Sequence, residues 1–437
     1  MARQGARRRR LACGRVARGR LARGRLARVL LALAAAGLAV LLALPLCGCG
    51  TADLPAPTPS ATPGAREFNV AVLYYDYDDP YVSSIRTALS SDLAHAGIPY
   101  EEYDADNSQS NQDQQVDQAL QGGASMLVVN IVTSGNAEVS DKVCLKAEAA
   151  GVPVVFFNRP VEGEGDEGAI LDYYDDVAFV GTDPEATGLL QGELIGTYLA
   201  EHYQEVDLDG DGRISYALFK GEAGNPEAIY RTKYAVERAN EVLEASGRPD
   251  LAYFDEGSVD RYQLDLTGSW SAASAHDYMR EDLLRIGAGH GDMIELVIAN
   301  NDSMAAGAIK ALQEEGYNLG TPSSTTIPVF GVDASATGRQ LISQGLMAGT
   351  VSQDPDAAAE CMCSMALNAR GGQDLLAGLD SYPRDEKDGL SRAVFIPCSI
   401  YEPEASEEPA ASTEDDGPVA AADGGSEGPS ALAGVAS

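Results

Sequence analysis

Short apolar runs alternate with longer stretches of helical periodicity through the middle of this 437-residue chain. The runs are rich in Val, Ile, Leu and Phe, and the stretches between most of them span roughly 12–20 residues. Short apolar strands that alternate with helices are typical of parallel sheets covered on both faces. The pattern predicts strands at 70–74, 126–130, 152–157, 178–180, 214–219, 251–254, 295–299 and 327–332, with helices near 80–96, 109–122 and 135–150.

The two ends of the chain lack this pattern. Residues 51–66 are rich in Pro, Ala and Thr, and residues 402–437 carry nine acidic residues but neither basic nor aromatic ones. Such segments cannot bury enough apolar surface to pack. We therefore expect a flexible tether over 49–67, a folded body near 68–400 that is long enough for two domains, and a disordered acidic tail over 402–437.

Residues 1–48 contain eleven Arg and no acidic residue. An apolar run of 18 residues, 29–46, leads into Leu46-Cys47-Gly48-Cys49, which resembles a bacterial lipobox. A basic start, an apolar centre and a small-residue end are typical of a signal peptide. We expect a signal peptide over 1–48, cleavage before Cys49, and a lipid on Cys49 that anchors the protein to the outer face of the cytoplasmic membrane. A retained membrane anchor is the alternative, because 18 apolar residues can span a bilayer.

The charge balance narrows the choice of partners. The chain has 31 Lys and Arg against 66 Asp and Glu, a net charge of −35, and only 20 of the basic residues lie after residue 48. A body this acidic repels phosphate backbones, so the composition excludes nucleic-acid binding. It suits an exported protein with an uncharged or cationic ligand.

Polar side chains follow five of the predicted strands, and ligands of parallel sheets bind at the carboxyl ends of strands. One Asp or Asn in such a place usually caps the next helix. Five together favour a ligand with many hydroxyls, because carboxylates and amides accept and donate hydrogen bonds to hydroxyl groups. Trp270 or Tyr81 could cover the apolar face of such a ligand, although Trp270 could equally be packed in a core. The polar segments are 76–81, 158–159, 220–227, 300–302 and Asp333.

Eight motifs, in order along 68–400, resemble the periplasmic galactose/glucose-binding protein family. The resemblance implies an α/β fold of the type I periplasmic binding protein, with two Rossmann-like lobes whose parallel sheets are joined by a three-segment hinge. The N-terminal lobe would hold 68–180 plus 354–394, and the C-terminal lobe 181–353 plus 395–401. The motifs are Tyr77-Asp-Asp, Val154–Asn158, Val180–Asp183, Gln191-Gly, Lys220-Gly-Glu, Val297–Asp302, Pro328–Ala334 and Ala348–Val351.

The resemblance also places the family's sugar contacts on ten residues of this sequence. Three of the ten, Asn225, Glu227 and Gln353, differ from the residues usual in the family. Each keeps its hydrogen-bonding capacity but changes its reach, and a buried polar group left unpaired costs ~1–3 kcal/mol, so these changes can alter which hexose is bound. The seven that match are Asp79, Tyr81, Asn158, Arg231, Trp270, Asn301 and Asp333.

The strongest local motif is the segment 207–215, Asp-Leu-Asp-Gly-Asp-Gly-Arg-Ile-Ser. Its spacing matches the start of a calcium loop, but an EF-hand would need Glu where Leu218 stands. The resembled family completes its site with a remote Glu, which here is Glu295. An Asp/Gly turn without metal is the alternative. The expected ligands of a structural Ca²⁺ are Asp207, Asp209, Asp211, the carbonyl of Arg213, Ser215 and Glu295.

Other chemistries have little support. The chain has four His, lacks a Gly-x-Ser-x-Gly motif within the expected folded body 68–400, and spaces its cysteines unlike a zinc site. We therefore expect a monomeric, calcium-stabilised and lipid-anchored hexose-binding protein rather than an enzyme, whose partners, by resemblance, are an ABC permease and its ATPase. The alternatives are a receptor ectodomain that presents sugar to a sensor kinase or chemoreceptor, and a glycosidase that uses Asp79, Glu227 and Asp333.

Overall fold

The computed structural model describes residues 67–164, 168–286, 293–383 and 392–403, all within the unit Arg66–Ser437. The expected signal peptide and Cys49 lie outside the described residues, as do all but residue 67 of the tether and all but residues 402–403 of the tail. None of the helices within the described ranges is long and apolar enough to cross a membrane.

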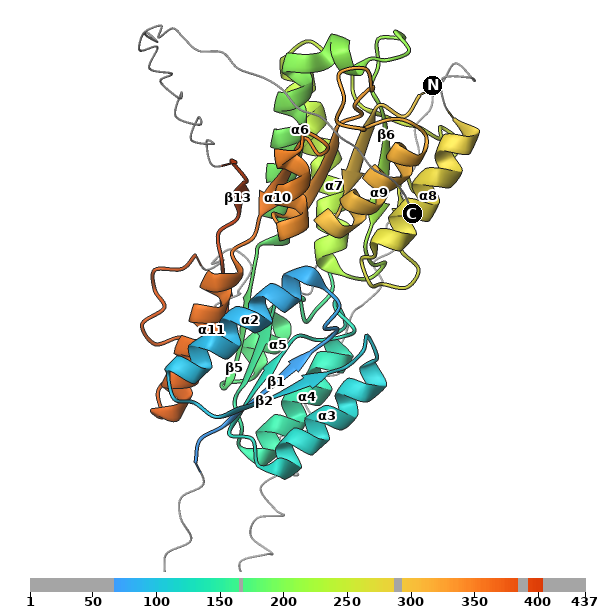
Figure 1. The fold of residues 1–437 in the computed structure, drawn as a ribbon. Helices are drawn as coiled ribbons and strands as arrows, with labels where there is room; N and C mark the ends of the chain where they lie inside the picture. The colour runs from blue at the N-terminus through green and yellow to red at the C-terminus, as the bar shows by residue number, and fades with distance from the viewer. Residues whose placement is uncertain (1–66, 165–167, 287–292, 384–391, 404–437) are drawn as a thin grey trace, which may run out of the picture. The chain divides into compact units, whose positions relative to one another are not determined.

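The first sheet consists of six parallel strands in the order β12-β5-β4-β3-β1-β2 (Figure 1). Every residue of its β1, β3, β4 and β5 is buried, as expected for strands covered on both faces. Five strands come from the first part of the chain and β12 from near its end. They are β1 (Val70–Tyr74), β2 (Tyr100–Asp104), β3 (Met126–Val129), β4 (Val154–Phe157), β5 (Val177–Gly181) and β12 (Ala393–Phe395).

Alternate residues of these strands face two separate core clusters. Val70, Val72 and Tyr74 belong to the cluster that also includes residues of α2 and α11, whereas Ala71 and Leu73 belong to the cluster with residues of α3, α4 and α5. The helices therefore cover both faces of the sheet. They are α2 (Pro80–His95), α3 (Gln109–Gly122), α4 (Ala137–Ala150), α5 (Ala169–Tyr173) and α11 (Pro355–Arg370).

The second sheet has the order β13-β11-β10-β9-β6-β7, with β8 also paired to β6. Its pairs are parallel except for β13, which runs antiparallel to β11. Helices α6 and α7 contribute to the core cluster on one face, and α8 and α9 to that on the other. The elements are α6 (Pro184–Val206), β6 (Ser215–Lys220), α7 (Pro226–Ala245), β7 (Ala252–Tyr253), β8 (Gln263–Leu264), α8 (Ala272–Arg285), β9 (Leu296–Ala299), α9 (Asp302–Glu314), β10 (Val329–Asp333), α10 (Ala336–Ser343), β11 (Gly349–Ser352) and β13 (Ser399–Ile400).

Three glycines bring α6 against α7. A Cβ at Gly188, Gly192 or Gly196 would lie 2.6–2.8 Å from the nearest atom of α7, so only glycine permits this separation. The contact matters for the site because α7 carries two of its charged side chains and α6 begins where the chain first leaves the first sheet.

The chain passes between the two sheets three times: from β5 to α6, from β11 to α11, and from β12 to β13. The outer two segments touch, since the Ile396 amide donates to the Gly181 carbonyl at 2.7 Å. The predicted fold, two lobes with parallel sheets joined by three segments, is confirmed. The apolar pattern did not predict β2, because its sequence Tyr-Glu-Glu-Tyr-Asp is a partly exposed edge strand, and the strand predicted at 251–254 shortens to the two residues of β7.

Candidate functional site

A small cavity lies where strand ends of the two sheets face each other. Nine of the ten residues predicted to contact sugar line it, together with one residue that was not predicted. The lining residues are Asp79, Tyr81, Asn158, Arg159, Glu227, Arg231, Trp270, Asn301, Asp333 and Gln353.

The first lobe contributes a carboxylate whose position is fixed. Asp79 follows β1 and caps α2, because its Oδ1 accepts from the amides of Tyr81 and Val82 at 2.9 and 3.0 Å. Its Oδ2 accepts from the Tyr75 hydroxyl at 2.6 Å. A carboxylate has about four acceptor sites, so Asp79 retains capacity for a ligand.

Asn158 follows β4 with a φ of 59°, a left-handed conformation that Asn tolerates better than most residues. Its backbone amide donates to the Val180 carbonyl at 2.8 Å. Its side-chain amide lines the cavity and makes no hydrogen bond to the described part of the chain. Both a donor and an acceptor are therefore presented to the cavity.

The second lobe contributes a buried ion pair from the start of α7. Arg231 donates through Nη2 to Glu227 Oε1 at 3.3 Å and through Nη1 to the Asn300 carbonyl at 3.0 Å. Burial raises the pKa of Glu227, while Arg231 and Arg159 oppose that rise. Arg231 Nε is buried and has no hydrogen-bond partner in the described structure, so this donor is available to a ligand.

Trp270 covers one side of the cavity and is only 5% exposed. Its φ is 55°, and a Cβ on Gly221 would overlap its ring, so the indole packs directly on the backbone of Gly221. Its Nε1 is buried without an acceptor among the described residues. The Trp270 ring is thus packed against the protein and also lines the cavity, so packing in the core and contact with a ligand do not exclude each other.

Asp333 ends β10 with a φ of 115° and accepts from Gln353 Nε2 at 2.7 Å. Burial raises the pKa of Asp333; the nearby carboxylates add to this rise, and Arg231 and Gln353 oppose it. Asn301 caps α9 by accepting from the Met304 amide at 2.9 Å and is buried at the cavity wall.

Asn225 is the one predicted contact that the structure does not bring into the cavity lining. It is fully buried, its Oδ1 caps α7 by accepting from the Glu227 amide at 2.8 Å, and its Nδ2 donates to Glu222 at 3.1 Å. Its neighbour in the same segment, Glu227, does line the cavity. The Asn225 side chain therefore caps the start of α7 and does not line the cavity.

The reasoning from sequence missed Arg159, although it stands beside Asn158 at the end of a strand. Its Nε and Nη2 donate to the carbonyls of Ile131 and Val132, each at 2.7 Å, and its guanidinium lies 4.1 Å from the Tyr75 ring centre. Nη2 also donates to Glu222 of the other lobe at 2.7 Å. Its position directly after a predicted binding Asn was the signal that could have identified it.

A second contact joins the lobes beside the cavity. Asn107 donates to the Thr267 carbonyl and to the Ser269 hydroxyl, both at 3.1 Å. With the Arg159–Glu222 pair, this contact joins the lobes around the cavity. A ligand between the lobes would be held by both of them.

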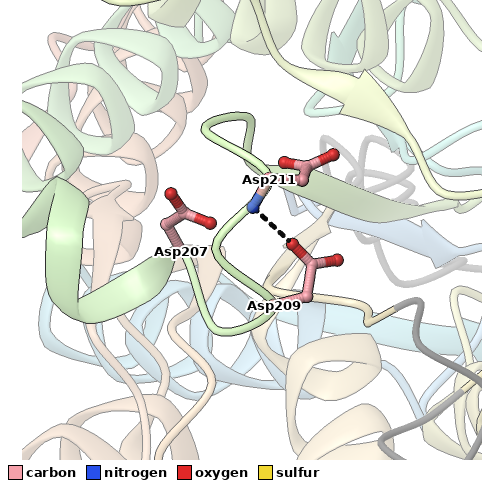
Figure 2. Close-up of side chains that lie close together, drawn as sticks. All are labelled: Asp207, Asp209 and Asp211. Carbon is pink, nitrogen blue, oxygen red and sulfur yellow. Dashed lines mark hydrogen bonds between the residues drawn. The ribbon is translucent and has the colours of Figure 1, made fainter.

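The aspartates of the predicted calcium loop come together (Figure 2). One carboxylate oxygen from each of Asp207, Asp209 and Asp211 lies within 4.8 Å of the others. Asp209 Oδ1 accepts from the Asp211 amide at 3.0 Å, and the two glycines of the loop, Gly210 and Gly212, have φ of 75° and 85°. Asp207 Oδ1 is buried without a hydrogen bond in the described structure, which is the feature expected of an oxygen that binds a cation.

The other three predicted ligands, Glu295, Ser215 and Arg213, are held by contacts with the protein itself. Glu295 is 1% exposed; its Oε1 accepts from the Leu208 amide at 2.6 Å and its Oε2 from the Ser215 amide at 2.9 Å. The Ser215 hydroxyl donates to the Met293 carbonyl, and the Arg213 side chain is exposed, 3.9 Å from Glu256. Burial raises the pKa of Glu295, and its backbone hydrogen bonds oppose that rise. The remote Glu therefore lies against the loop backbone.

Comparisons with known proteins agree with this architecture. A family model described as periplasmic binding protein domain matches residues 70–374. The chain is 34% identical over 317 residues, 72% of this chain and 85% of the relative, to the D-galactose/methyl-galactoside binding periplasmic protein MglB of Haemophilus influenzae.

Solved structures show the same fold. A solute-binding protein of Clostridium phytofermentans with bound β-D-glucose aligns with a TM-score of 0.59 and 18% identity over 76% of this chain and 93% of that one. One from Bacillus halodurans with bound myo-inositol aligns with a TM-score of 0.56 and 22% identity over 78% and 96%. Given the family match and the similarity to MglB, this chain belongs to the periplasmic binding protein family.

Proposed function

We propose that this protein binds a hexose in the cavity between its lobes and delivers it to an ABC importer. The observation that carries the proposal is the cavity itself: nine residues that match or replace the sugar contacts of a galactose/glucose-binding protein meet in one space. The relative that is 34% identical is a galactose-binding protein, which supports the same ligand class.

The chemistry of the lining suits a monosaccharide. Carboxylates from both lobes, Asp79 and Asp333, can accept from neighbouring hydroxyls, while Asn158 and Arg231 can donate to ring or hydroxyl oxygens. The Trp270 ring offers an apolar surface for the C–H face of a sugar.

Isothermal titration calorimetry with a panel of sugars tests this proposal. We expect D-galactose or D-glucose to bind more tightly than D-ribose or myo-inositol. Trp270→Ala should weaken hexose binding at least tenfold, since a buried aromatic side chain in a binding site carries a large share of the binding energy. Tyr278→Ala, an aromatic deletion in the same lobe outside the cavity, is the matched control. A panel in which no hexose binds contradicts the proposal.

The same panel separates a binding protein from a glycosidase. We infer a binding protein, because the relatives identified are transport components and every lining carboxylate already has a structural partner. Incubation with aryl glycosides should release no phenol. Delivery to a sensor kinase or chemoreceptor would use the same cavity, and growth of a deletion strain on the bound sugar distinguishes import from sensing.

We further propose a structural Ca²⁺ in the loop 207–215. Asp207, Asp209 and Asp211 would supply carboxylate oxygens, with the Arg213 carbonyl, Ser215 and Glu295 completing the site. Hard oxygen donors in this number are typical of Ca²⁺ sites. The buried, unpartnered Asp207 Oδ1 supports the proposal. A bound cation would offset the mutual repulsion of the carboxylates and join the loop to the start of β9.

The signal-peptide pattern over 1–48 and the lipobox-like segment 46–49 are the basis for a proposal about where the protein lies in the cell. We propose export and a lipid on Cys49 that holds a monomeric protein at the outer face of the cytoplasmic membrane. In detergent phase partitioning, the wild-type protein should enter the detergent phase and Cys49→Ser should not. Cys47→Ser is the control, since it leaves the proposed lipid-bearing thiol in place.

A further inference from the structure

Asp302 is a fully buried carboxylate that lies beside the cavity without lining it. It is the first residue of α9, directly after Asn301, which does line the cavity. A buried carboxylate is costly unless hydrogen bonds compensate for the lost water, so the partners of Asp302 indicate what it does.

One oxygen of Asp302 accepts from β11 and the other from the turn after β10. Oδ1 accepts from the Thr350 hydroxyl at 2.6 Å, and Oδ2 accepts from the Ser335 amide at 2.7 Å. The Thr350 oxygen in turn accepts from the Ala334 amide at 3.4 Å. The amides of both residues that follow Asp333 therefore lead to Asp302, one directly and one through Thr350.

The turn held in this way is strained. Asp333 has a φ of 115° and Ala334 a φ of 49°, two adjacent residues with side chains in a region that favours glycine. Such conformations cost of the order of 1–3 kcal/mol each and persist only when the surrounding structure fixes them. A Cβ at Gly331 or Gly338 would overlap the Asp302 carboxylate, so glycine at both positions leaves room for it.

We propose that Asp302 is a positioning residue of the binding site, which holds the turn after β10 so that the Asp333 carboxylate faces the ligand. Gln353 holds the Asp333 carboxylate itself, through its 2.7 Å hydrogen bond. The inference rests on the proposed sugar binding in this cavity. It assigns part of the affinity to a residue that does not touch the sugar.

Two substitutions of Thr350 separate positioning from general stability. Thr350→Val keeps the volume but removes the hydroxyl, whereas Thr350→Ser keeps the hydroxyl but loses a buried methyl group. Hexose affinity, measured by calorimetry, should fall about three- to tenfold in Thr350→Val and stay within about twofold in Thr350→Ser. Thermal unfolding should show that Thr350→Ser is also destabilised. Equal losses of affinity in both variants would overturn the proposal.

A double-mutant cycle tests whether the effect passes through Asp333. In an Asp333→Asn background, Thr350→Val should lower affinity by less than a further twofold. If it lowers affinity by the same factor in both backgrounds, the two residues act independently and the proposal is wrong. Should Thr350→Val not fold, Asp302→Asn takes its place in the cycle, with Asp282→Asn, a buried carboxylate elsewhere in the same lobe, as the control.

The outcomes for this inference and for the proposed function are distinguishable. A wild-type protein that binds no hexose refutes the proposed function, and the inference with it. A wild-type protein that binds hexose while Thr350→Val and Asp302→Asn bind it equally well refutes the inference alone.

Discussion

The ion pair between Arg159 and Glu222 joins the two lobes in this structure. We call this joined state the closed arrangement, and the contribution of the ion pair to it can be measured. Arg159 is 3% exposed and keeps two hydrogen bonds to carbonyls of its own lobe, so it stays in place when the lobes separate. The Glu222 side chain is 21% exposed and belongs to the other lobe. Glu222→Gln keeps the shape and an acceptor oxygen for Asn225 but removes the charge, and therefore weakens the contact with Arg159.

The size of the effect lies between two limits. Exposed ion pairs contribute ~0–1 kcal/mol, and breaking fully buried ones costs ~3–5 kcal/mol. With one partner buried and the other partly exposed, we expect a loss of about 1–2 kcal/mol for closure. If the sugar is held by the closed arrangement, hexose affinity should fall roughly 5- to 30-fold, because every 1.4 kcal/mol corresponds to a factor of ten.

Calorimetric titration with the hexose identified by the panel measures this loss, and small-angle X-ray scattering of the ligand-free protein measures opening. Glu244→Gln on the exposed side of α7 is the control, with the same change in net charge. Wild-type affinity and scattering in Glu222→Gln would show that this ion pair contributes nothing to closure.

Three further predictions concern stability and the indole. Chelation should lower the melting temperature of the wild-type protein but not that of Asp207→Asn, and identical shifts would argue against calcium in this loop. Burial raises the pKa of Asp282 to about 7, so the folded state favours its protonated form; stability should fall by roughly 2–3 kcal/mol between pH 5 and 8 in urea unfolding, and Asp282→Asn should lack this part of the loss. An equal pH dependence in both proteins would contradict this. Gly221→Ala should displace Trp270, weaken hexose binding and change the indole fluorescence, whereas Gly224→Ala, where a Cβ has space, should change neither.

The sequence predicted the buried strands well, because their apolar character follows from being covered on both faces. It did not predict β2, whose polar residues lie at the sheet edge, the short strands β11 and β12, or the short pairs formed by β8 and β13. These short elements exist because neighbouring strands offer unpaired backbone groups, which is information about tertiary structure rather than about local pattern.

The site residues show the same division. The family's motifs found Asp79, Trp270 and Asp333, and two of these, Asp79 and Asp333, also belong to the polar segments at strand ends. They could not show that the Asn225 side chain is used as a helix cap, nor that Asp302 holds the turn after β10, since both depend on which backbone amides lie within reach. The role of Arg159 depends on Glu222, 63 residues later in the chain.

The return of the chain to its first sheet has a consequence for the order of folding. The β12 edge of that sheet and the α11 cover over α2 come from residues 355–395, after the whole second sheet except β13 has been made. A chain emerging from a translocation channel thus holds an incomplete first lobe, with the apolar side of α2 uncovered, until almost its last folded residues arrive. Contacts this distant in sequence are slow to form, so the second lobe, which then lacks only the two residues of β13, should fold before the first lobe is complete.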